Sequence, residues 1–227
     1  MDTFDCIRTR RSIRKFHHTK IPEEALYAVL DAANLAPCAG NLQTWQFLIV
    51  EDEAKKKVIA EAALEQDWIA TAPTVILLLS NPNMTKAEFG DKVGDTYDNQ
   101  NTMLAAENLI LAAWNLGIGS TFVGSFTESR LRKEFKIPAA IKIHAIIPLG
   151  YPVEISRPLG RAGIEDCTHI EEWNKKIRKE RRLISALVYP EKEEIRFGEL
   201  AEETTKKVIE KVKKEVKKRI PKAKKKK

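Results

Sequence analysis

The chain has 227 residues, and 43% of them are hydrophobic, which is enough to build the core of one α/β domain with an extension. Its three cysteines lie far apart and form no CxxC pair, which argues against a disulfide framework or a cysteine-based zinc site. The first 16 residues hold no apolar signal-peptide core, and no apolar run reaches the roughly 20 residues of a membrane span. We therefore expect a soluble, cytoplasmic protein.

The positive charge is confined to one end of the chain. The whole chain has a net charge of +7, but residues 206–227 hold 13 Lys or Arg and two acidic residues, a net charge of +11. The rest of the chain is therefore mildly acidic, at −4. The basic character describes a tail and not the folded part.

The first half of the chain predicts two helices and a strand. Pro22 suits the first turn of a helix, where its missing N–H does no harm, and an apolar stripe follows until Pro37 and Gly40 stop it. Residues 45–50 read as a strand, and residues 54–64 read as a second helix.

The middle of the chain should hold the core. Residues 74–79 are continuously apolar, which is typical of a strand buried on both faces. Residues 83–97 look like a polar excursion. The helix expected over about 101–116 is apolar nearly all round, so it should be buried.

Three more elements complete the pattern. We expect a short strand at 120–123, a helix that Thr127 caps and that runs to Phe135, and a last core strand over 141–149. The sum is an α+β fold, with a small mixed sheet around a buried central helix.

A cluster of basic residues lies near the N-terminus, with Ser12 among them. The planar guanidinium of arginine matches a phosphate with two parallel hydrogen bonds, so an anion site is one interpretation. A solvated helix end is an equally simple alternative, and nucleic-acid binding is a third, although only Phe16 supplies an aromatic ring nearby. No glycine-rich phosphate loop occurs anywhere. The cluster consists of Arg8, Arg10, Arg11, Arg14 and Lys15.

Five segments, in order, resemble the nitroreductase-like family of flavoproteins. The segment RRSIRKF resembles the family's opening signature, and APCAGNLQTW resembles its APSAGNxQPW segment. The central stretch AAENLILAAWNLGIG and two shorter segments follow in the expected order. The five segments occupy residues 10–16, 36–45, 105–119, 121–126 and 147–152.

This resemblance implies an intertwined homodimer with FMN in a cleft at the subunit interface. Arg10 and Ser12 would meet the FMN phosphate and ribityl chain, with Arg11 beside them. Arg14 would approach the N1/O2 edge of the flavin, where a cation stabilises the reduced ring. Arg161 would grip the phosphate, with Arg157 as its rival for that role.

The resemblance also assigns two further groups of residues. Gly124 and Ser125 match backbone positions near the flavin. The isoalloxazine and ribityl would be lined from the other subunit by Pro37, Cys38, Ala39, Asn41 and Gln43. An ordinary turn-rich loop that ends a helix is the alternative reading of this last group.

Three positions depart from the family pattern. Cys38 stands where serine is common, Thr44 stands where proline is common, and Asn101 replaces an expected acidic residue. None of them removes a cation from the phosphate site, but they bear on substrate and pyridine-nucleotide preference. We expect neither a metal site nor a dedicated catalytic side chain, since the cofactor performs the chemistry.

The resemblance predicts an FMN-dependent oxidoreductase that works by a ping-pong cycle. NADH or NADPH would reduce the flavin, which then passes electrons to a nitroaromatic, a quinone or a similar small-molecule acceptor. Reductive dehalogenation or flavin fragmentation on the same fold is one alternative. Nucleic-acid binding through the basic tail is another.

The chain divides into three predicted regions. Residues 1–175 would form the FMN-binding domain, and residues 176–200 a C-terminal extension. Residues 201–227 would form a Lys-rich amphipathic helix and a basic tail, with weak contact to an anionic surface as one role for it.

Overall fold

The computed structural model describes residues 1–157, 160–176, 206–207 and 210. The predicted extension 176–200 and the predicted tail 201–227 therefore lie almost wholly outside the described residues. No helix of the described part is both long and apolar enough to cross a membrane. The α-helices are α1 (Thr3–Thr9), α2 (Glu23–Asn34), α3 (Glu53–Ala62), α4 (Asn83–Phe89), α5 (Asp91–Asn115) and α6 (Glu128–Phe135). The 3₁₀-helices are η1 (Ala39–Asn41), η2 (Asp67–Thr71) and η3 (Ile164–Asp166).

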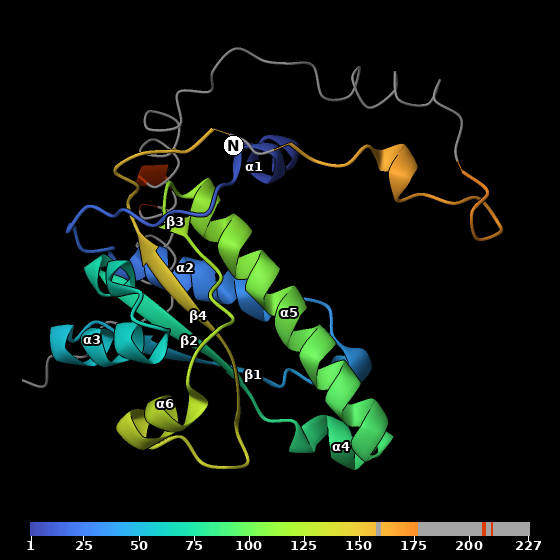
Figure 1. Cartoon of the computed structure of the whole chain (residues 1–227), viewed down its shortest axis with the longest axis horizontal. Coiled ribbons are helices and arrows are strands. Elements are labelled where there is room, and N and C mark those ends of the chain that lie inside the picture. Colours follow the sequence, from blue (N-terminus) through green and yellow to red (C-terminus); the bar gives the residue numbers. More distant parts are fainter. Residues whose placement is uncertain (158–159, 177–205, 208–209, 211–227) are drawn as a thin grey trace, which may run out of the picture.

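One sheet organises the described residues into an α+β fold, as the sequence predicts (Figure 1). Its strand order is β1-β2-β4-β3, and each of the three strand pairs is antiparallel. The sequence predicted a mixed sheet, but these strands pair only in the antiparallel sense; the parallel contact in the described part is an isolated bridge between Ser12, which lies outside the strands, and Ser120. The strands are β1 (Trp45–Val50), β2 (Thr74–Ser80), β3 (Gly119–Ser120) and β4 (Lys142–Gly150).

Strand β2 lies at the centre, and every one of its residues is buried. Val75 and Leu77 belong to the core cluster that also contains residues of α3 and α6. Ile76 and Leu78 belong to the cluster that contains residues of α2 and α5. Successive side chains of a strand point to opposite faces, so the apolar run fills two cores, as predicted.

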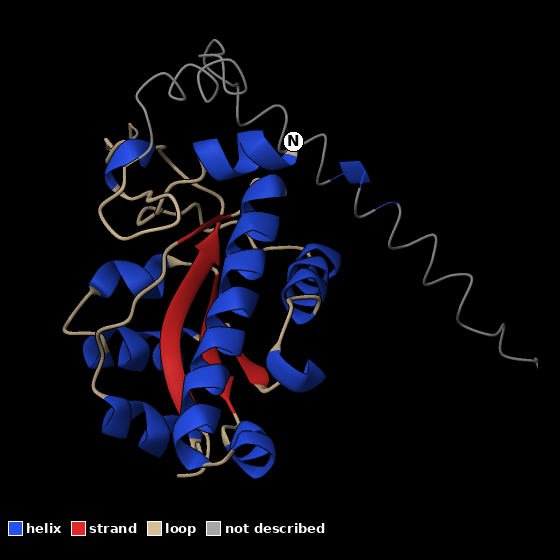
Figure 2. Ribbon diagram, turned by 90° about the vertical axis from the view of Figure 1, so that its right-hand side faces the viewer, coloured by secondary structure: helices blue, strands red, loops and turns tan. Residues whose placement is uncertain are grey.

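Helix α5 crosses one face of the sheet over almost its whole length (Figure 2). It begins at Asp91 and not near residue 101, so the predicted polar excursion over 83–97 was wrong. That segment is α4 and the first turns of α5. The buried face of the first turns of α5 carries Gly94 and Asp98, four residues apart, and not apolar side chains. A Cβ at Gly94 would lie 2.6 Å from the backbone of Lys86, which explains the glycine.

The remaining elements differ from the prediction mainly at their ends. The strand expected over 120–123 shrinks to β3, followed by a single bridge between Val123 and Ile146. Thr127 occupies the position before α6, but its side chain makes no capping hydrogen bond. The short helix α1 had no predicted counterpart. Asp2 caps it by accepting from the Asp5 N–H at 2.8 Å.

Candidate active site

The segment that follows α1 is attached to the edge of the sheet. The Ile13 N–H donates to the Ser120 carbonyl at 2.9 Å, and the Thr121 hydroxyl donates to the Ile13 carbonyl. The approach is so close that a Cβ at Gly119 would lie 2.6 Å from the Ile13 side chain. Ile13 is buried while Ser12, its neighbour, is exposed. Because neighbouring residues of an extended chain face opposite ways, burying Ile13 turns Ser12 outward.

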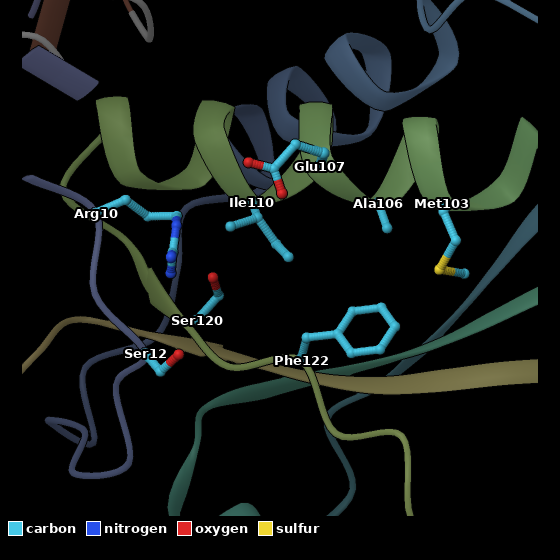
Figure 3. Close-up of a pocket in the computed structure, with 8 residues that line it drawn as sticks. All are labelled: Arg10, Ser12, Met103, Ala106, Glu107, Ile110, Ser120 and Phe122. Carbon is cyan, nitrogen blue, oxygen red and sulfur yellow. The ribbon is translucent and has the colours of Figure 1, made fainter. Parts of the chain in front are cut away.

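A cavity of about 320 Å³ lies between this segment and α5 (Figure 3). Helix α5 forms one wall. The opposite wall comes from the segment after α1, from β3 and from the residues that follow it. The volume is at the lower end of the range for small-molecule pockets. Its lining consists of Arg10, Ser12, Met103, Ala106, Glu107, Ile110, Ser120 and Phe122.

The two ends of the cavity differ in chemistry. Arg10, Ser12 and Ser120 gather at one end, while Phe122 and Met103 lie at the other (Figure 3). The first end offers a guanidinium and two hydroxyls, the second offers apolar surface, and the Glu107 carboxylate lies on the α5 wall between them (Figure 3). Such a cavity suits a ligand with an anionic end and a flat apolar body.

The polar end concentrates positive charge. Burial lowers the pKa of Arg11, and the nearby charges of Arg10 and Arg161 lower it further. Among the described residues, no ion pair joins any of these three to a carboxylate. Glu107 of α5 also lines the cavity (Figure 3), but it forms no ion pair with these cations, so their charge stays available to an anionic ligand. Arg161 therefore belongs to this group of cations, whereas Arg157 is not among the charges that act on Arg11.

Two of the arginines predicted to meet the flavin, Arg11 and Arg14, do not line the cavity of the isolated chain. The Nη1 atom of Arg11 donates to the carbonyls of Arg8 and Arg10, at 2.9 and 2.7 Å. Arg11 therefore binds carbonyls at the C-terminal end of α1 and does not line the cavity. The Arg14 guanidinium lies over the Trp68 ring, 5.7 Å from its centroid, which is within cation–π range.

The predicted loop 37–43 does not line the cavity either. Asn41 and Gln43 are exposed, and the Gln43 amide donates to Oδ1 of Asn41 at 2.9 Å. Asn101 of α5 holds this loop, accepting from the Ala39 N–H at 2.9 Å. Met103, which lines the cavity, lies two residues further along the same helix, and side chains two apart face different sides. The loop and the cavity of one chain therefore lie on different sides of α5.

Gly124 and Ser125 lie just beyond the cavity wall. Both are exposed, and a Cβ at Gly124 would lie 3.7 Å from the Phe122 ring. They are close to a lining residue without lining the cavity themselves.

Most of the cavity wall was not predicted. Phe122 and Ser120 lie within or next to motif segments, but nothing in their local pattern marked their side chains. Glu107 carried a usable signal, because it is the one charged residue in the apolar stretch 103–116. Met103, Ala106 and Ile110 looked like ordinary core residues of a buried helix.

Beneath β2, a buried polar network joins α5 to the sheet. The Ser80 hydroxyl donates to Oδ2 of Asp98 at 2.7 Å and lies 2.7 Å from Nε2 of His144. Since the one hydroxyl hydrogen goes to Asp98, Nε2 of His144 must be the donor to Ser80. The sequence pattern placed His144 in the core but did not reveal its partners.

The network decides the charge state of Asp98. Burial acts to raise the pKa of this carboxyl, but hydrogen bonds from His144, Ser80 and Thr44 outweigh burial, and the pKa lies below its ordinary value. Within the described residues, the Thr44 hydroxyl and Oδ1 of Asp98 nevertheless lack hydrogen-bond geometry to any group. We therefore attribute the carboxylate's stabilisation mainly to Ser80 and His144.

The buried Cys6 thiol gives no competing chemistry. Burial raises the pKa of the Cys6 thiol to about 11, so it stays protonated and unreactive near neutral pH. Among the described residues, no group of three or more His, Cys, Asp or Glu could hold a metal ion.

Comparison with known proteins bears on the family directly. The model of the Nitroreductase family matches residues 7–66 and 60–151. A protein of Methanothermobacter thermautotrophicus, named provisionally as an NADH dehydrogenase/NAD(P)H nitroreductase, is 33% identical over 178 residues, which cover 76% of this chain and 88% of that protein. The iodotyrosine deiodinase of Thermotoga neapolitana is 26% identical over 174 residues, covering 66% of this chain and 88% of that one.

A solved structure agrees with the sequence comparison. The nitroreductase family protein from Clostridium novyi superposes with a TM-score of 0.62 at 27% identity, covering 78% of this chain and 97% of that one. The shared fold, the ordered motifs and the family match coincide over the part of the chain that carries the cavity. The chain therefore belongs to the nitroreductase family.

Proposed function

We propose that the chain is an FMN-dependent oxidoreductase that takes electrons from NADH or NADPH and passes them to a nitroaromatic, a quinone or a similar acceptor. The observation that carries this proposal is the charge at one end of the cavity. Arg10 shares that end with Ser12 and Ser120, and Arg161 lies near enough to act on Arg11. Glu107 lines the same cavity, but among the described residues no ion pair joins a carboxylate to Arg10, Arg11 or Arg161. FMN brings a phosphate to such a site.

The residues present fit this cofactor. Arg10 and Ser12 would hold the phosphate and ribityl, with Arg161 as a third contact. Met103 and Phe122 offer the apolar surface on which a flat ring packs (Figure 3). Arg11 supports the site indirectly, because its hydrogen bond to the Arg10 carbonyl helps to fix the backbone there.

A second copy of the chain completes the proposed site. The cavity of one chain lacks residues 37–43, which lie on the other side of α5. Helix α5 also exposes Leu104, at 45%, and the cavity exposes Phe122, at 41%. Exposed apolar side chains beside an incomplete site favour a homodimer in which each chain supplies its loop to the other's cleft.

Bound FMN supplies the hydride-accepting ring, so the protein needs no catalytic triad. The chain's own residues bind the cofactor, orient it and balance its charge. Arg14 is the residue proposed to stabilise negative charge on the reduced ring, once it leaves or shares its place over Trp68. Solvent can supply the protons that the reduced acceptor takes up.

A dehalogenase-type reaction is the second candidate, favoured by the deiodinase relative. Such a reaction needs a cover over the substrate, and α4 with the first turns of α5 now stands where the sequence showed only a polar excursion. Nucleic-acid binding through the tail concerns residues outside the described part.

The visible absorption spectrum of the purified protein tests the proposal first. We expect the bands of oxidised flavin, and FMN in the supernatant after denaturation. NAD(P)H should bleach the bands, and menadione or nitrofurazone should restore them. A colourless protein that also fails to take up added FMN contradicts the proposal, and retention of FMN by a monomer contradicts the shared cleft.

A further inference from the structure

We propose that Asn101 is a positioning residue, which fixes the conformation of residues 38–42 and thereby the geometry in which this segment meets the flavin. The part concerning flavin rests on the function proposed above. The part concerning the segment rests on contacts within one chain.

The side chain of Asn101 bridges the two ends of the segment. Its Oδ1 accepts from the Ala39 N–H at 2.9 Å, and its Nδ2 donates to the Leu42 carbonyl at 3.3 Å. The side chain is almost completely buried, with 2% of its surface exposed. Both halves of one amide are thus used on the backbone of one loop, across about 60 residues of sequence.

Only an amide can make both contacts as they stand. A carboxylate accepts but does not donate, so an ionised aspartate here would face the Leu42 carbonyl with like charge. This accounts for the asparagine at a position where the motif comparison led us to expect an acidic residue. The asparagine that departs from the family pattern thus binds both ends of the loop, which an ionised acidic residue could not do.

The segment is a tight turn whose placement depends on contacts with neighbouring elements. Gly40 and Asn41 both have positive φ, at 60° and 55°. Asn41 carries a side chain in this left-handed region, where only glycine is free of steric cost. A Cβ at Gly40 would lie 3.0 Å from the Phe89 ring, so α4 confines the segment from a second side.

The segment's own backbone hydrogen bonds lie within its single turn. They run from the Asn41 N–H to the Cys38 carbonyl at 3.3 Å and from the Leu42 N–H to the Ala39 carbonyl at 3.1 Å. The Asn101 bonds are the ones that attach this turn to α5.

The consequence for function follows from what the segment carries. Cys38, Asn41 and Gln43 are the residues proposed to face the flavin of the other subunit. Cys38 and Asn41 lie within the segment that Asn101 holds, and Gln43 follows it directly. Asn101 itself lies on α5 and does not line the cavity.

Two substitutions on α5 and one on the loop test the inference. Asn101→Asp keeps the acceptor and removes the donor, and Asn101→Ala removes both. Asn108→Ala is the matched control, because Asn108 also lies on α5 and donates to a backbone carbonyl, that of Ala32 at 3.1 Å, but does not contact the loop.

Ala39→Pro removes the N–H from the loop side and leaves the helix intact. Proline is accepted at the first position of a helical turn, which Ala39 occupies in η1. The residue before it, Cys38, already has the extended conformation that a following proline requires, with φ −149° and ψ 150°. This variant keeps the test valid should the α5 substitutions fail to fold.

The first readout is hydrogen exchange without cofactor. We expect the Ala39 amide to exchange about tenfold faster or more in Asn101→Ala and at the parent rate in Asn108→Ala. The second readout is the FMN dissociation constant with the visible circular dichroism of the saturated flavoprotein. Both Asn101 variants and Ala39→Pro should bind FMN about tenfold or more weakly and alter the flavin signal, with Asn108→Ala unchanged.

The outcomes separate the two proposals. Folded Asn101 variants with parent-like exchange at Ala39 and parent-like FMN binding overturn the positioning role, as does an equal effect of Asn108→Ala. The double variant of Ala39→Pro with Asn101→Ala gives a further check. If its loss of FMN affinity equals the sum of the losses in the two single variants, the two residues do not act through one shared contact. A parent chain that takes up no FMN overturns the proposed function instead, because the exchange measurement does not depend on the cofactor.

Discussion

The hydroxyl of Ser80 lies 2.7 Å from Oδ2 of Asp98, a side chain with none of its surface exposed. Ser80 ends the central strand β2, and Asp98 lies on α5, so this contact joins the sheet to the helix that forms the cavity wall. His144, with 3% of its side chain exposed, donates to the same hydroxyl from β4. One serine therefore links three elements of the core.

Substitution of Ser80 by alanine should destabilise the protein strongly. It leaves the Asp98 carboxylate and His144 Nε2 without their shared partner in a buried site, which costs about 2–3 kcal/mol in the free energy of unfolding. Urea denaturation followed by circular dichroism measures this loss. Ser129→Ala, on the exposed face of α6, is the control and should stay within about 0.5 kcal/mol. An equal, small effect of both substitutions would show that the network contributes little.

Stability should fall in acid because of Asp98. Its pKa is lower in the folded state than in the unfolded chain, where aspartate titrates near about 3.9. The stabilisation is therefore complete above the unfolded value and is lost as pH falls through the folded value. Urea denaturation at a series of pH values should show this loss.

The same series on Asp98→Asn and Ser80→Ala identifies the group. Asp98→Asn should be less stable near neutrality and should lack the part of the acid dependence that this carboxyl supplies. Ser80→Ala should shift the loss to higher pH, since the hydrogen bond from Ser80 lowers the Asp98 pKa. An acid profile that both substitutions leave unchanged would assign the dependence to other carboxyls.

Sequence patterns predicted the elements whose buried faces are apolar and missed those whose buried faces are not. The apolar run of β2 was readable because it fills two cores. The first turns of α5 were not readable, because their buried positions hold Gly94 and Asp98 and not the apolar residues whose spacing would have indicated a helix. Arg10 and Ser12 were found through the motif, and the structure brings them together with Ser120 and Phe122. The motif also assigned the loop around Asn41 to the site, and that assignment stays a prediction, because this loop does not line the cavity of one chain. The distance between them depends on the path of the chain around α5, which no local pattern shows.

Arg14 should tune the flavin if the proposed function holds. Arg14→Ala removes a cation that would stabilise the reduced ring, so the reduction potential of the bound FMN should fall. Trp68→Ala releases the guanidinium from its place 5.7 Å from the indole centroid, and should produce a smaller change in potential. Spectroelectrochemical titration of FMN-saturated protein measures both. An unchanged potential in Arg14→Ala, with FMN fully bound, would remove Arg14 from this role.

Arg161 and Arg157 compete for the phosphate, and the electrostatics favour Arg161. Its charge acts on Arg11, next to the cavity residue Arg10, and Arg157 is absent from that interaction. Arg161→Ala should weaken FMN binding about tenfold, the loss typical of one charge-assisted hydrogen bond. It should leave the affinity for riboflavin, which lacks the phosphate, nearly unchanged.

Fluorescence titration of both flavins into cofactor-free protein makes this comparison, with Arg157→Ala as the matched control. Both arginines are exposed, so neither substitution should unfold the chain. A selective loss of FMN affinity in Arg157→Ala alone would assign the phosphate contact to Arg157 and not to Arg161. An equal loss of FMN and riboflavin affinity in Arg161→Ala would show that this side chain supports the ring or the fold and not the phosphate. The ratio of the two affinities thus locates the anionic end of the ligand without a bound structure.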